Sequence, residues 1–156
     1  MNLLNNFFFI ALPYIALFVF LIGSIYRYKS KKFTYSSLSS QFLETRQLYW
    51  GSLPFHWGIV FLFFGHLIAF ALPQSLLLWN QQPARLAILE ITAFVFGIMT
   101  LLGLINLFYR RITNPRIRKV SNYMDIILEV LLLAQIFLGL WVAYGFRWGS
   151  SWFAIV

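Results

Sequence analysis

Apolar residues along the chain gather into four long runs that shorter polar segments separate. The runs cover residues 6–26, 53–72, 86–109 and 123–145, and each is too long for a buried strand. Because about 20 apolar helical residues cross the core of a bilayer, the pattern predicts an all-α integral membrane protein with four transmembrane helices in a bundle. No repeat or linker interrupts the chain, so we predict one membrane domain over residues 1–156.

The composition agrees with this pattern and removes several classes of chemistry. The chain is 61% hydrophobic and 10% charged, whereas soluble domains are typically about 45–50% apolar and about 25% charged. The 156 residues contain no cysteine. They therefore provide no disulfide, no thiolate nucleophile, no c-type haem attachment and no iron–sulfur cluster of their own.

The net charge of +8 becomes informative once the cations are placed between the runs. Five of the twelve Lys and Arg residues lie between the first and second runs, and five lie in residues 110–119. Four helices put both segments on one side of the membrane, and the positive-inside rule makes that side cytoplasmic. The amino terminus is then outside. We interpret the charge as a topology signal, with contact to the lipid bilayer and no nucleic acid as partner.

Both histidines of the chain, His56 and His66, lie in the second run. Ten helical residues separate them by about 15 Å along the axis and about 80° around it. Polar groups inside a membrane often serve a function, and two histidines at different depths could each donate one axial ligand to a b-type haem. Gly58 and Gly65 are small enough for a porphyrin to approach. The alternative is an interhelical hydrogen bond from each histidine.

Two carboxylates begin the fourth run. Asp125 and Glu129 stand one turn apart, where negative charge favours a helix amino terminus. We expect the cations Arg116, Arg118 and Lys119 to neutralise them. The residues of hydrolytic chemistry are missing, because the sequence has no Ser–His–Asp set, phosphate-cradling glycine loop or HExxH motif.

The sequence resembles the gamma subunit of membrane-bound respiratory nitrate reductase, the dihaem cytochrome b that anchors that complex. The likeness covers nearly the whole chain. It is sharpest in FFFIALPYIALFVFLIGSIYRY (7–28), SSQFLE (39–44), FHWGIVFLFFGH (55–66), RRITNPRIR (110–118) and DIILEVLLLAQIFLGL (125–140).

The resemblance implies a quinol-oxidising subunit of an oxidoreductase in the cytoplasmic membrane of a bacterium or archaeon. Electrons would pass through two b haems to an iron–sulfur beta subunit and a molybdenum alpha subunit on the cytoplasmic side. It implies that His56 binds the inner haem and His66 the outer haem as axial iron ligands. Gly65, His66 and Arg85 are the candidates for the quinol site. The family has a lysine at this site, and Arg85 is the basic residue closest to its position, although an arginine cannot accept a proton. No residue is assigned as catalytic.

The sequence departs from the family in one respect. Members continue through a fifth helix that supplies the second histidine for each haem, whereas this sequence holds two histidines in all. We expect that the sequence is an incomplete version of a longer protein. A separate polypeptide, or a second copy in a two-fold dimer, could instead supply the missing ligands. A different class of function also stays open, a haem-free scaffold that only anchors soluble subunits.

Overall fold

The structure is a computed structural model that describes residues 3–30 and 46–146. Nearly all of these residues are helical, and no strand occurs within the two ranges. The predicted all-α fold class is therefore confirmed. The described residues fall into two compact units, Leu3–Ser30 and Arg46–Phe146. That both units belong to one membrane domain stays a prediction.

The first unit is a continuous helical stretch with a widened turn near its beginning. It consists of α1 (Leu3–Asn6), the π-helical turn η1 (Phe7–Ala11) and α2 (Leu12–Ser30). Pro13 lies two residues after the end of the π turn. Proline has no N–H and its ring crowds the carbonyl four residues earlier, so a wider turn ahead of it relieves the clash. The backbone N–H of Leu12 correspondingly bonds to the carbonyl of Phe7, five residues back.

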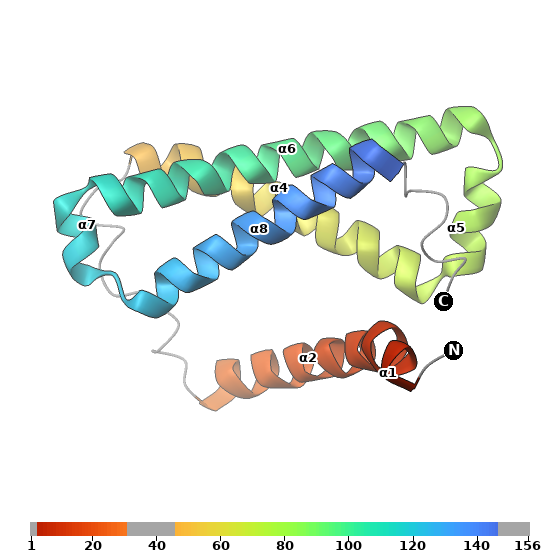
Figure 1. The fold of residues 1–156 in the computed structure, drawn as a ribbon, viewed down its shortest axis with the longest axis horizontal. Helices are drawn as coiled ribbons and strands as arrows, with labels where there is room; N and C mark the ends of the chain where they lie inside the picture. Colours follow the sequence, from red (N-terminus) through yellow and green to blue (C-terminus); the bar gives the residue numbers. More distant parts are fainter. Residues whose placement is uncertain (1–2, 31–45, 147–156) are drawn as a thin grey trace. The chain divides into compact units, whose positions relative to one another are not determined.

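The second unit contains three long helices and two short ones (Figure 1). The long helices are α4 (Arg46–Ala71), α6 (Pro83–Thr113) and α8 (Tyr123–Phe146). The short helices α5 (Pro73–Asn80) and α7 (Pro115–Val120) lie at opposite ends of α6. Proline is the first residue of α5, α6 and α7, where its missing N–H costs no helical hydrogen bond.

Helix α4 crosses α6 closely because glycines stand at the crossing. A methyl group added at Gly103 would lie 2.7 Å from the carbonyl oxygen of Gly51. Further along the same two helices, the rings of Phe61 and Phe96 stack with their centroids 4.2 Å apart. Small residues that allow backbones to approach are typical of packed membrane helices. Helix α8 packs on α6 from another side, so α6 is the central helix of this unit.

Three helices of the described ranges are long and apolar enough to cross a membrane: Arg46–Ala71, Pro83–Thr113 and Tyr123–Gly145. They contain the third and fourth predicted runs and all of the second except its last residue, Leu72. The first predicted run, residues 6–26, is not among them, because the π turn divides it and Arg27 and Lys29 occupy the last turn of α2. Four spans and an external amino terminus therefore stay predictions.

The long apolar helices leave many large hydrophobic side chains uncovered. On α8, for example, Leu131, Phe137 and Trp141 are each about 60% exposed. Exposed apolar area of this extent is unusual for a soluble monomer. It is what a helix surface in contact with lipid requires.

Candidate functional site

The two histidines lie on α4, as the sequence predicts, and both side chains are exposed. Each ring is anchored by its own helix. Nδ1 of His56 lies 2.7 Å from the carbonyl oxygen of Ser52, and Nδ1 of His66 lies 2.7 Å from that of Leu62. A carbonyl oxygen only accepts hydrogen bonds, so Nδ1 is the donor in both rings. In the neutral ring, Nε2 then carries the lone pair.

This arrangement is the one that a metal-binding histidine needs. Ligating histidines usually donate their second ring N–H to a carbonyl or carboxylate, which fixes the tautomer and the orientation of the ring. His56 has an additional neighbour, because the Ser52 hydroxyl oxygen lies 3.0 Å from the same Nδ1. Position 62 is a leucine, so His66 has no hydroxyl at the corresponding place. The two rings are therefore held similarly but not identically.

A shallow hollow of about 450 Å³ runs beside His56 on one face of α4. All of its lining residues belong to this helix: Leu48, Tyr49, Ser52, Leu53, His56 and Trp57. The lining is mainly apolar and aromatic. A surface of this kind suits a flat hydrophobic ligand whose one polar attachment is to the imidazole.

The two glycines near the histidines have different surroundings. A methyl group at Gly65 would meet no atom within 4 Å, so the helix surface next to His66 is open. A methyl group at Gly58 would overlap the Thr100 hydroxyl and lie 2.8 Å from the carbonyl oxygen of Phe96. The expectation that a porphyrin could approach at Gly58 is wrong, because α6 already occupies that face.

Arg85 lies in the first turn of α6, and its guanidinium carbon is 4.9 Å from the centroid of the Trp79 ring on α5. A guanidinium over an indole face is a cation–π contact. The contact holds the cation at the same end of α6 as the short helix α5 (Figure 1). Among the three quinol-site candidates, Gly65 and His66 are neighbours on α4, while Arg85 comes from a different helix.

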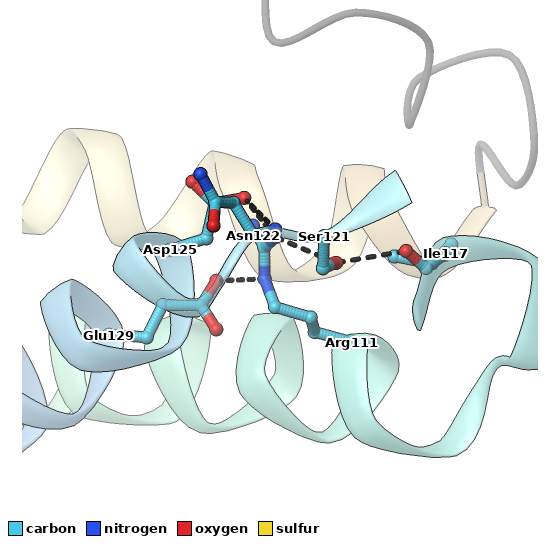
Figure 2. Close-up of polar contacts among 6 residues, drawn as sticks. All are labelled: Arg111, Ile117, Ser121, Asn122, Asp125 and Glu129. Carbon is cyan, nitrogen blue, oxygen red and sulfur yellow. Dashed lines mark hydrogen bonds and ion pairs between the residues drawn. The ribbon is translucent and has the colours of Figure 1, made fainter. Parts of the chain in front are cut away.

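A polar cluster joins the far end of α6 to the beginning of α8 (Figure 2). Arg111 donates from Nε to Glu129 at 2.9 Å and from Nη1 to Asp125 at 3.2 Å. The same Nη1 donates to the Ser121 hydroxyl at 3.0 Å. The expectation that Arg116, Arg118 and Lys119 neutralise the two acids is wrong for the described residues, since Arg111 forms both ion pairs. The cluster ties two helices together and provides no ligand set, because no three His, Cys, Asp or Glu side chains of the described ranges gather as a metal site.

Comparison with known proteins gives a consistent result. The family model of the nitrate reductase gamma subunit matches residues 5–154. The chain is 39% identical over 138 residues to the respiratory nitrate reductase 2 gamma chain of Escherichia coli (strain K12), which covers 88% of this chain and 61% of that one. It is 36% identical over 132 residues to the nitrate reductase gamma chain of Bacillus subtilis (strain 168), which covers 82% and 58%. The respiratory nitrate reductase 1 gamma chain of E. coli is 36% identical over 141 residues, or 90% and 63%. The chain thus spans about three fifths of the length of these relatives.

Proposed function

The chain belongs to the nitrate reductase gamma subunit family, and we propose that it serves as the quinol-oxidising membrane subunit of a respiratory nitrate reductase. In this proposal it anchors an iron–sulfur beta subunit and a molybdenum alpha subunit at the cytoplasmic face. It passes electrons from quinol to them through two b haems. The observation that carries the proposal is the shared anchoring of His56 and His66, each through Nδ1 to a carbonyl one turn back.

His56 and His66 would each provide one ligand to a haem. Both imidazoles are exposed on α4, and the Nδ1 bonds leave Nε2 as the basic nitrogen. The apolar hollow beside His56 and the open surface at Gly65 give room for a flat macrocycle. A b haem bound there supplies reversible one-electron transfer at its iron. His56 and His66 lie about 15 Å apart along α4, so they would hold the two haems at different depths.

If each haem has two histidine ligands, as the resemblance implies, the second one would come from outside these 156 residues, because the sequence contains two histidines. A continuation of the chain is the source that we favour, since the relatives are longer. A partner polypeptide or a second copy of this chain is the alternative source.

The assignment of inner and outer haem follows from the proposed topology. Four spans with cation-rich segments inside put the amino terminus outside, and α4 then runs from the cytoplasm outward. His56 becomes the inner ligand and His66 the outer one. The proposed quinol site lies beside His66 and the open surface of Gly65, where Arg85 contributes a hydrogen-bond donor to a quinone oxygen.

The test is a reduced-minus-oxidised spectrum of the membrane complex. The unmodified protein should give two b-type centres. His56→Ala should remove one and His66→Ala the other, and only the second change should abolish electron entry from quinol. Each variant is the matched control of the other, because both remove one exposed imidazole from the same helix. A complex that is folded, inserted and free of b-type absorption would refute haem binding.

The alternative is a haem-free scaffold that only anchors soluble subunits to the membrane. The exposed cations at the α6–α7 end of the second unit favour it, because they could meet acidic partner surfaces. A double His56→Ala/His66→Ala variant distinguishes the two functions. Under the scaffold function this variant retains its partner subunits and loses no activity, whereas under the cytochrome function it retains the subunits and loses quinol-dependent reduction.

A further inference from the structure

The short helix α7 is held rigidly at the turn between α6 and α8. The side chain of Ile117, in the middle of this helix, is completely buried. The Ser121 hydroxyl donates to the Ile117 carbonyl oxygen at 2.9 Å and accepts from Arg111 at 3.0 Å (Figure 2). The side chain of Asn114 caps the beginning of the helix by accepting from the N–H of Arg116 at 3.1 Å. The orientation of α7 is thereby fixed from both ends.

The cations of α7 face away from this buried contact. Arg116, Arg118 and Lys119 are all exposed. Two of them, Arg118 and Lys119, line a hollow of about 320 Å³ together with Ile112, Thr113 and Pro115. Arg116 does not line it. The hollow therefore combines two positive charges with the exposed apolar side chain of Ile112 at the end of α6.

The acids closest in the sequence do not neutralise these charges. Asp125 and Glu129 are the carboxylates that follow α7, and in the described part of the chain both form their ion pairs with Arg111. Asp125 also accepts from the backbone N–H of Asn122 at 3.0 Å. Their negative charge is thus neutralised by Arg111 between α6 and α8. Arg118 and Lys119 are therefore available to an external anion.

The position of the hollow indicates the kind of anion. It begins where the candidate span Pro83–Thr113 ends, at the level where phospholipid head groups lie. The Ile112 side chain that lines it is 47% exposed, and Val120 at the end of α7 is exposed to the same extent. Cations next to exposed apolar side chains match a lipid phosphate joined to acyl chains.

We propose that the hollow formed by Ile112, Thr113, Pro115, Arg118 and Lys119 binds the phosphate head group of an anionic phospholipid. Arg118 and Lys119 bind the phosphate, and the acyl chains lie along Ile112 and the other exposed apolar side chains of α6. The site is independent of the haem and quinol proposals, because it uses none of their residues.

The test compares two double variants of the purified membrane complex that lose the same charge. Arg118→Gln/Lys119→Gln removes both cations of the hollow. Lys29→Gln/Arg116→Gln removes two exposed cations outside it, one of them on the same short helix. Phosphatidylglycerol is titrated into each protein in detergent with phosphatidylcholine as the reference lipid, and bound lipid is measured by native mass spectrometry. A parallel titration contains inorganic phosphate to separate the lipid from the free anion.

A cation at a membrane surface contributes about fivefold to anionic-lipid binding, so the hollow variant, which loses two cations, should bind phosphatidylglycerol about 25-fold more weakly. The control variant should differ from the unmodified protein by less than about threefold, and inorganic phosphate should not displace the lipid. Equal loss in both double variants would overturn the proposal in favour of a diffuse surface charge. Displacement by inorganic phosphate would overturn it in favour of a free anion. Unchanged lipid binding with loss of a co-purified partner subunit would overturn it in favour of protein docking.

Discussion

Gly58 provides the sharpest test of how the second unit is held together. Alanine at this position would put a methyl group 2.8 Å from the Phe96 carbonyl oxygen and 3.0 Å from the Thr100 backbone nitrogen, and into overlap with the Thr100 hydroxyl. Carbon contacts are favourable only from about 3.5 Å. Two of the three atoms are backbone, so a change of rotamer cannot relieve the overlap. Helices α4 and α6 must separate instead.

The expected cost follows from two opposed effects. Overpacking a tight contact costs about 1–3 kcal/mol, and the backbone contacts put Gly58→Ala near the upper end. Alanine in place of glycine favours a helix by about 1 kcal/mol. The net loss should therefore be about 2 kcal/mol, which is about thirtyfold in the folded-to-unfolded ratio. Separation would also weaken the Phe61–Phe96 stack, whose centroids are 4.2 Å apart.

The assay is unfolding in mixed micelles of a mild detergent and sodium dodecyl sulfate, followed by circular dichroism. Gly65→Ala on the same helix and Gly139→Ala on α8 are the controls, since a methyl group at either meets no atom within 4 Å. Thr100→Ala should partly rescue Gly58→Ala, because it removes the hydroxyl that the new methyl overlaps. The rescue should be about 1 kcal/mol of coupling between the two sites. If Gly58→Ala unfolds at the same detergent fraction as the two controls, the close crossing of α4 and α6 is refuted.

Four further results are expected. Arg111→Gln should destabilise the protein by about 2 kcal/mol in the same unfolding assay, because it leaves two carboxylates without their shared cation; an unchanged transition would contradict the pairing. Ser52→Ala keeps the backbone carbonyl that orients the neighbouring imidazole, so haem titration should give at most about tenfold weaker binding at that centre alone. Arg85→Gln should raise KM for quinol about tenfold with both b centres still reducible by dithionite, and an unchanged KM would exclude the residue from the site. Because the sequence has no cysteine, Gln82→Cys and Lys119→Cys should be labelled by an impermeant maleimide from opposite sides of the membrane; labelling from one side would refute the topology.

The apolar runs predicted the long helices of the second unit and the beginning of α8 at Tyr123, but not the ends of α4 and α6. The second run was expected to begin at residue 53, and α4 begins at Arg46. The apolar run marks the part that lipid can cover, whereas the helix continues as long as its backbone bonds are satisfied. In these two extra turns, the amides of Gln47 and Asn106 join α4 to α6 at 3.3 Å. A contact between residues 59 positions apart leaves no signal in a local pattern.

Spacing along one helix predicted the histidine pair, and it could not predict which helix covers which face. Helical periodicity relates His56 to His66, and both lie on α4 with the same Nδ1 anchor. The same periodicity could not tell that Gly58 faces α6 while Gly65 stays open. The ion pairs of Arg111 were missed for a similar reason, since the turn at α7 brings α6 back against α8. The cations of α7 had been expected to pair with the two acids because they lie close to them in the sequence.

The geometry of α4 separates the two tasks that the helix is proposed to perform. Gly51, Gly58 and Gly65 repeat every seven residues, so they form one nearly straight row along the helix. Gly51 and Gly58 lie against α6, whereas α6 no longer covers the row at Gly65. His56 lies about 160° from this row and His66 about 80° from it. Substitutions in the first part of the row should therefore change stability with little effect on the haem spectrum. Substitution of either histidine should change the spectrum with little effect on stability, because both imidazoles are exposed.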